Sequence, residues 1–271
     1  MSAGKPLWGS RASIGAAAVM LSLLAACSST PRDETAGMSN EKLYAEARDE
    51  AAAGNYERAI RFYERLEGRA AGTLLSQQAQ LELAYSYYRT NEKAQALATL
   101  DRFIKLHPSS PALDYALYLK GLVNFNDNLG LFGRLSRQDL SERDQQAAKE
   151  SFQTFRQLVE QFPDSPYAPD ARLRMKYIVN SLASYEVHVA RYYFRRGAYL
   201  AAANRAQQAI QDYQESPAIE EALHILTQSY DRLGLTELRD DAQRVLQASF
   251  PDSAYLTQRF ESDKRPWWQL W

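Results

Sequence analysis

The strongest constraint on the fold is a short segment that recurs four times along the chain, at residues 106–111, 162–166, 213–217 and 250–253. In most of these segments a proline follows an aromatic or apolar residue and stops a helix. Ser110, Ser165 and Ser216 can each cap the next helix, with a proline at its first position. The chain is therefore predicted to be divided into helical units of similar design.

A second pattern lies between these segments. From about residue 40 the chain is rich in good helix formers, and apolar residues recur at steps of three and four. Small residues at matched positions resemble those of the tetratricopeptide repeat, where two helices cross closely. The matched positions 59, 96, 151, 202 and 239 lie 37, 55, 51 and 37 residues apart. We expect an all-α fold, a right-handed superhelical array of about five tetratricopeptide-like helix pairs, with Arg239 in a terminal capping unit.

The N-terminus has the pattern of an export signal. Lys5 and Arg11 precede an apolar run at residues 14–26, which is too short to span a membrane as a helix. The run ends in Leu-Ala-Ala before Cys27, which resembles the bacterial lipobox. That resemblance implies removal of residues 1–26 and acylation of Cys27. The alternative is an ordinary signal peptide that happens to be followed by a cysteine.

Acyl chains on Cys27 would anchor the chain stably, since two or more chains hold a protein at a membrane. By the same resemblance, a residue other than Asp after the cysteine permits sorting to the outer membrane, and Ser28 stands there. The expected organisation is a signal peptide (1–26), a lipidated flexible tether (27–39), N-terminal repeats (40–125), a loop insertion (126–146), C-terminal repeats (147–256) and a tryptophan-rich tail (257–271). The insertion is either functional or a tolerated surface loop.

The tail contains three of the four tryptophans of the chain, Trp267, Trp268 and Trp271. A polar segment precedes them, so they do not simply end a core helix. Tryptophan suits places where one end of the ring is apolar and the other is wet. Two interpretations are open: the tryptophans contact a partner or a membrane, or they pack back on the last repeat.

Catalytic, metal or cofactor chemistry is not indicated. The histidines, His107, His188 and His224, stand apart, and no known nucleophile, metal or phosphate-loop motif occurs. A net charge of -1 without a clustered basic excess argues against a nucleic-acid partner. We expect a non-enzymatic binding protein without cofactor or metal, and a lipid-anchored hydrolase is the less favoured class.

An ordered series of short motifs adds a family resemblance over residues 40–255. It includes Ser76-Gln77-Gln78, Arg143-Asp144, Tyr192-Tyr193 and Asn204-Arg205. With the lipobox and the repeats, this series resembles the BamD family of ComL-like lipoproteins. The resemblance implies a scaffold on the periplasmic face of the outer membrane, in the machinery that assembles β-barrel proteins there. The alternative is a periplasmic repeat lipoprotein that coordinates cell-wall or division enzymes.

The resemblance also implies partners. The C-terminal repeats would hold a periplasmic domain of the barrel subunit, the N-terminal repeats would receive unfolded outer-membrane proteins, and accessory lipoproteins would join the complex. Asn204, Arg205, Arg143 and Asp144 match partner-contacting positions, although Arg205 could also be a solvated arginine. Residues 69–75 lack the aromatic and proline residues common in the family, which puts a substrate groove built on aromatic contacts there in doubt.

Overall fold

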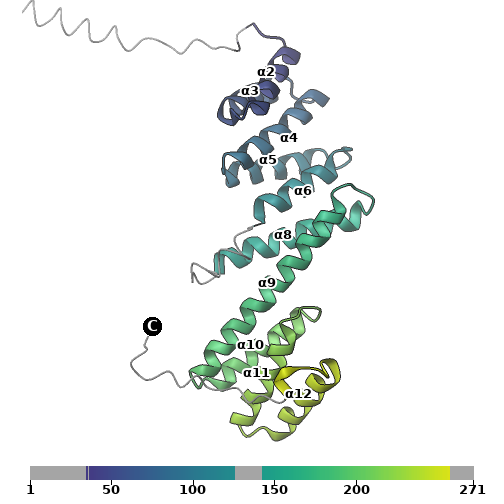
Figure 1. Cartoon of the computed structure of the whole chain (residues 1–271). Coiled ribbons are helices and arrows are strands. Elements are labelled where there is room, and N and C mark those ends of the chain that lie inside the picture. Colours follow the sequence, from purple (N-terminus) through teal and green to yellow (C-terminus); the bar gives the residue numbers. More distant parts are fainter. Residues whose placement is uncertain (1–34, 36, 126–141, 257–271) are drawn as a thin grey trace, which may run out of the picture.

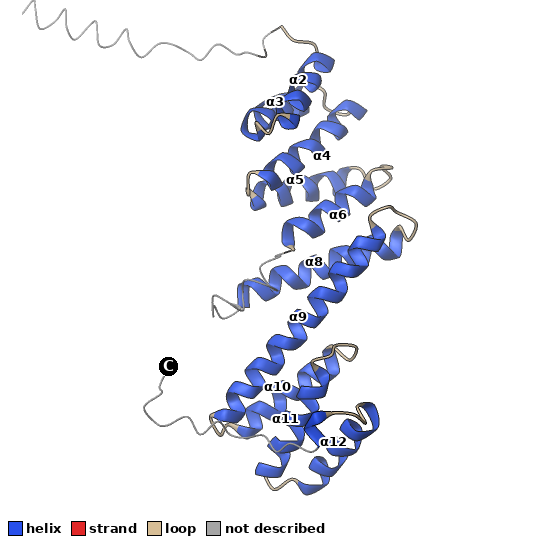
Figure 2. Ribbon diagram, viewed as in Figure 1, coloured by secondary structure: helices blue, strands red, loops and turns tan. Residues whose placement is uncertain are grey.

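The protein is an elongated stack of paired helices in the computed structural model (Figures 1 and 2). The structure describes residue 35, residues 37–125 and residues 142–256, with only the backbone at 142–144. The elements are α2 (Asn40–Ala52), α3 (Tyr56–Arg69), α4 (Leu74–Arg89), α5 (Lys93–Leu106), α6 (Leu113–Asn124), α8 (Glu142–Gln161), α9 (Ala168–Arg195), α10 (Tyr199–Asp212), α11 (Ile219–Arg232), α12 (Thr236–Ser249) and the 3₁₀ turn η2 (Ala254–Leu256). No strand occurs in these ranges, so the predicted all-α fold is confirmed.

Five successive pairs make up the array: α2 with α3, α4 with α5, α6 with α8, α9 with α10, and α11 with α12. Each helix packs on the next along the chain, and α4 and α11 also contact the first helix of the preceding pair. The number of predicted tetratricopeptide-like pairs is therefore confirmed.

Three buried clusters run along the stack. The first joins α2 to α6, the second joins α6, α8 and the first half of α9, and the third joins the second half of α9 to α12. Helix α9 has 28 residues and is therefore about 42 Å long at 1.5 Å per residue. Its Ile178 belongs to the middle cluster and its Phe194 to the C-terminal one. This single helix explains the long repeat spacing before position 202.

The turn inside four of the pairs requires a left-handed residue. Gly54, Gly197 and Gly234 have φ values of 85°, 78° and 73°, and Asn91 takes the equivalent place with φ 63°. Glycine and asparagine are the residues that adopt this conformation at least cost. The sequence therefore fixes where the second helix of each of these pairs begins.

The serine junctions repeat in atomic detail. The hydroxyls of Ser110, Ser165, Ser216 and Ser253 each accept the N–H of the residue two positions later, at 3.2–3.3 Å. The N-cap residues of the α-helices are Ala112, Tyr167 and Ala218, so these serines are not the caps that we expected. The proline is not the first α-helical residue either. The serine carbonyl accepts the N–H three residues later, which makes a tighter first turn, and the α-helix begins two residues after the proline.

Helices α6 and α8 cross closely at Gly121, a matched small residue. A Cβ atom built there would lie 2.4 Å from the ring of Phe155 on α8. The Ser151 hydroxyl donates to the Gly121 carbonyl at 2.9 Å and is fully buried. Small residues at the crossing of α6 and α8 therefore have the packing role that the repeat pattern predicts.

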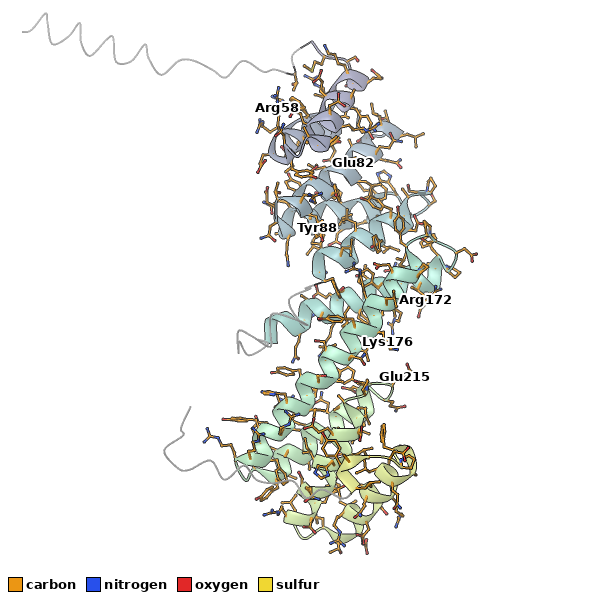
Figure 3. All side chains as sticks on the ribbon, viewed as in Figure 1. Arg58, Glu82, Tyr88, Arg172, Lys176 and Glu215 are labelled. Atoms are coloured by element: carbon orange, nitrogen blue, oxygen red, sulfur yellow. The ribbon has the colours of Figure 1, made fainter. Side chains whose placement is uncertain are left out.

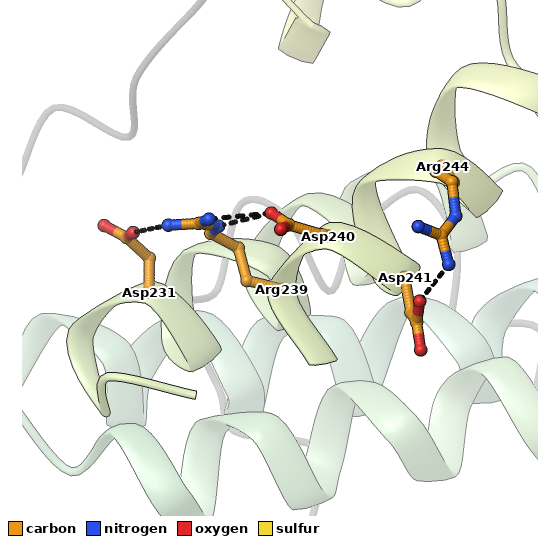
Figure 4. A network of polar contacts seen from close by, with 5 residues as sticks. All are labelled: Asp231, Arg239, Asp240, Asp241 and Arg244. Atoms are coloured by element: carbon orange, nitrogen blue, oxygen red, sulfur yellow. Dashed lines mark hydrogen bonds and ion pairs between the residues drawn. The ribbon is translucent and has the colours of Figure 1, made fainter. Parts of the chain in front are cut away.

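The start of one helix differs from expectation, and one exception to the repeat pattern is explained. Helix α8 begins at Glu142, so residues 142–146, which we expected in the loop insertion, are helical. Their composition suits a first helical turn, since acidic residues there favour the helix dipole. At the other end, Arg239 makes ion pairs with Asp231 and Asp240 (Figure 4), as a polar residue of a terminal unit can.

Candidate partner-binding surface

Arg205 and Asn204 lie on α10, the second helix of the fourth pair. Asn204 is exposed, while the Arg205 guanidinium is 3.1 Å from a carboxylate oxygen of Glu186 on α9. The Glu186 side chain is only 7% exposed, whereas that of Arg205 is 41% exposed. One face of the guanidinium therefore neutralises a buried carboxylate, and other N–H groups face solvent. Arg205 is held in one place as well as accessible to a partner.

The buried carboxylate also affects its surroundings. Burial raises the pKa of Tyr213, and the negative charges of Asp212 and Glu186 raise it further. Charge reversal of Arg205 would place a second carboxylate against Glu186. A loss of partner binding in such a variant would then have two causes that the experiment does not separate, a lost contact and a damaged fold.

A second ion pair links α9 to α11. Arg191 donates to both carboxylate oxygens of Glu221, from Nε at 2.6 Å and from Nη2 at 2.5 Å. This two-point geometry fixes the side chains more firmly than a single contact. One turn along α11, the buried His224 ring stacks on Tyr255 with centroids 4.8 Å apart. Burial lowers the pKa of His224, and Glu221 opposes this change.

The remaining predicted site residues are only partly placed. Arg143 and Asp144 lie in the first turn of α8, and their side chains are not described. Cys27 and the three tail tryptophans lie outside the described residues, as does the insertion up to residue 141. The structure therefore locates Asn204 and Arg205 and does not bring them together with the other predicted partner-binding residues.

A group of tyrosines around Glu82 was not predicted. Burial raises the pKa of this α4 carboxyl, labelled in Figure 3, while Arg48 opposes the change. The charge of Glu82 in turn raises the pKa values of Tyr44, Tyr63 and Tyr115, in each case after the larger effect of burial. Side chains from α2, α3 and α6 thus surround one partly buried carboxylate.

Further aromatic groups continue this surface. Arg89 donates to the Tyr85 hydroxyl at 2.8 Å and lies over the ring of Tyr56, 4.7 Å from its centroid. The Tyr63 hydroxyl is buried and has no hydrogen-bond partner among the residues that the structure describes. Aromatic contacts in the N-terminal repeats therefore come from tyrosines on the helices, although residues 69–75 lack aromatic residues. The signal available in the sequence was an acid between Leu81 and Leu83 in a largely apolar stretch of the chain.

The described part of the chain offers little for catalysis or ligand capture. It contains no cluster of three or more side chains suited to a metal ion. A polar cavity of about 510 Å³ lies between α6 and α8, and its walls carry both signs of charge, including Lys120, Lys149 and Glu150.

No helix between residues 37 and 125 or between 142 and 256 is long and apolar enough to cross a bilayer.

Comparison with known proteins places the chain in a family. The YfiO family model, described as outer membrane lipoprotein, matches residues 36–246. The outer membrane protein assembly factor BamD of Neisseria meningitidis serogroup A is 48% identical over 237 residues, which cover 88% of this chain and 89% of that protein. The same factor of Vibrio cholerae is 36% identical over 227 residues, covering 84% of this chain and 94% of that protein.

The family model spans the helix pairs that the structure shows, from the first pair into α12 of the fifth. The family resemblance predicted from the ordered motifs is confirmed by identity at this level over most of both chains. The chain belongs to the BamD family of outer membrane lipoproteins, whose members are named as outer membrane protein assembly factors.

Proposed function

We propose that the chain is a lipid-anchored, non-enzymatic scaffold of the machinery that inserts β-barrel proteins into the outer membrane. The names of its relatives support a role in outer-membrane protein assembly. Cys27 would carry the acyl anchor and hold the helical array at the periplasmic face of that membrane. The array would act by binding and positioning proteins.

The C-terminal repeats are proposed to bind the periplasmic domain of the barrel subunit. The observation that carries this proposal is the Arg205 side chain, fixed against Glu186 and still 41% exposed. Pre-organised guanidinium groups are effective at interfaces, because little conformational entropy is lost on binding. Asn204 is exposed on the neighbouring position of α10 and would add amide hydrogen bonds.

The N-terminal repeats are proposed to receive unfolded outer-membrane proteins. Tyr44 and Tyr115, which are partly exposed beside the Glu82 carboxylate, combine apolar ring faces with polar hydroxyls, and this suits the mixed surface of an extended chain. Arg143, Asp144 and accessory lipoproteins are assigned to the same complex by family resemblance.

Affinity purification of the tagged chain from detergent-solubilised envelopes tests this function. We expect a barrel protein with periplasmic domains to co-purify. Recovery of cell-wall synthases or hydrolases in its place would support the alternative, a coordinator of cell-wall or division enzymes. A Cys27→Ala variant gives a second readout, because the protein should then leave the outer-membrane fraction.

A further inference from the structure

Helix α12 carries three exposed apolar side chains along one border of its buried face. Leu235, Leu238 and Val245 are 42%, 45% and 48% exposed. They lie three and seven residues apart and therefore share one side of the helix, next to the buried Ala242 and Leu246. We call these three residues the outer stripe. Arg239 with Asp240 and Arg244 with Asp241 form ion pairs on the same helix, and Arg239 also pairs with Asp231 of α11 (Figure 4).

The outer stripe is particular to the last pair. The second helices of four pairs can be aligned on their N-cap residues, which are Asn55, Glu92, Ala198 and Leu235. Three positions later stand Arg58, Gln95, Ala201 and Leu238, and ten positions later stand Arg65, Arg102, Gln208 and Val245. Large apolar side chains occupy these outward positions in α12 and in none of the other three.

The same alignment shows that α12 does not expose the face on which a further repeat would stack. Five positions after the N-cap stand Ile60, Leu97, Ala203 and Asp240. Ile60 and Ala203 are buried and Leu97 packs against the first cluster, whereas Asp240 is exposed. This stacking position is thus polar, as in a terminal capping unit, whereas exposed apolar side chains lie along the border of the buried face.

We propose that the outer stripe is the docking site of this chain's own C-terminal segment, residues 257–271. This inference is independent of the proposed assembly function. The described chain ends at Leu256 in η2, which contacts α11 next to the end of α12. Fifteen residues remain beyond it, among them Trp267, Trp268 and Trp271.

The length of this segment suits the site. Residues 257–266 can span up to about 33 Å, whereas α12, with 14 residues, is about 21 Å long. The tryptophans can therefore reach any part of the outer stripe. Their rings would cover exposed leucine and valine, while the indole N–H groups would remain near the charged residues beside the stripe. Among the four helices that can be aligned, only α12 has this stripe, and α12 is also the helix that the tryptophan-rich segment follows.

Intrinsic fluorescence tests the proposal directly. Under excitation selective for tryptophan, the full chain carrying Trp8→Phe emits only from Trp267, Trp268 and Trp271. We expect its emission to be blue-shifted from that of N-acetyltryptophanamide and to resist iodide quenching. The double variant Leu238→Gln/Val245→Gln places at these positions the residue type found at Gln95 and Gln208. It should shift the emission back to the red and restore quenching.

Leu173→Gln is the matched control, since Leu173 is 70% exposed on α9 and should leave the emission unchanged. Far-ultraviolet circular dichroism should be the same for all variants, because the altered side chains are exposed. Solvent-like emission of the parent chain would overturn the proposal. A blue shift that survives in the α12 double variant would also overturn it, because that result is expected when the tryptophans insert into detergent. A blue shift that disappears on dilution would overturn it as well, because that result is expected when the tryptophans bind a second copy of the chain.

Discussion

The N-terminal and C-terminal repeats use the same helix pairing but handle buried polar groups differently. In the N-terminal repeats a partly buried carboxylate, Glu82, lies among tyrosines. In the C-terminal repeats the buried carboxylate of Glu186 has a guanidinium partner, Arg205. The first arrangement leaves an aromatic surface with one carboxylate, and the second holds a cationic group in place. One fold thus presents two surfaces of different chemistry.

The cores of the two regions differ as well. Eleven positions after the N-cap, the second helices place Leu66, Phe103, Ala209 and Leu246, all of them buried. Phe103 in α5 and Ala209 in α10 stand at the same repeat position, and the other buried residues of α10 are also alanines. This difference in side-chain size predicts closer helix packing around α10. Substitutions at equivalent positions should therefore have unequal effects.

The largest expected effect is at this position. Phe103→Ala should lower the free energy of unfolding by about 3–5 kcal/mol, because it removes a ring that is 1% exposed and leaves a cavity. The reciprocal change, Ala209→Phe, should cost about 1–3 kcal/mol or more through overpacking. Chemical denaturation measures both. Equal tolerance of a ring at both positions would contradict the difference in helix packing.

The next effect is at the Arg205–Glu186 pair. Arg205→Gln should destabilise the fold by about 1.5–3 kcal/mol, because a buried carboxylate loses its charged hydrogen-bond donor. The double variant Glu186→Gln/Arg205→Gln should recover most of this loss, since no buried charge remains. Thermal or chemical unfolding of the two single variants and the double variant gives the coupling energy. A coupling near zero would show that the pair does not stabilise the C-terminal repeats.

Acidification should act on the two regions in opposite directions. The pKa of Glu82 is raised in the folded state, so its contribution to stability decreases as pH rises from its ordinary value through the folded value. Burial lowers the pKa of His224 in the folded state. Its contribution to stability is therefore present above the ordinary histidine pKa, and it is lost as the pH falls from that pKa through the lowered pKa of the folded state.

Hydrogen exchange of the two regions at pH 5 and pH 7 measures this difference. Relative to the parent chain, Glu82→Gln should flatten the pH dependence of the N-terminal helices and His224→Gln that of α11. Each variant should leave the other region unchanged. The same pH dependence in parent and variant would show that these groups are not the cause.

The smallest effect is expected at the surface of α12. Arg244 pairs with Asp241, and both side chains are more than half exposed, at 75% and 60%. Exposed pairs of this kind contribute little, so Arg244→Ala should change the free energy of unfolding by less than about 0.5 kcal/mol. Urea denaturation at low and moderate salt checks this. A loss as large as that of Arg205→Gln would mean that exposed and buried charges matter equally here.

Local chemistry made much of the fold predictable. The serine junctions, the glycine or asparagine at four turns and the small residues at helix crossings act within a few residues or between adjacent helices, so their patterns appear in the sequence. The start of α8 and the extra turns of α9 were not predicted, because good helix formers continue across both boundaries.

The site was less predictable. Asn204 and Arg205 came from family resemblance, but the partner of Arg205 depends on how α9 and α10 are aligned against each other. Glu82 appeared only as an acid in an apolar pattern, and its tyrosines come from three other helices. Contacts between side chains far apart in the sequence depend on packing geometry, which periodicity does not specify.

The central claim is that the C-terminal repeats bind the barrel subunit through the guanidinium of Arg205. The most direct test is the affinity of the purified periplasmic domain of the barrel subunit for four forms of the chain. These are the parent chain, Glu186→Gln, the double variant Glu186→Gln/Arg205→Gln, and Glu82→Gln as the control in the N-terminal repeats. We expect Glu82→Gln to bind as the parent chain does. Glu186→Gln should bind somewhat more weakly, because Arg205 keeps its charge but loses the carboxylate that holds it in place. The double variant should bind about tenfold more weakly or worse, as expected for loss of a charged hydrogen bond. Binding of the double variant at parental strength would contradict the claim.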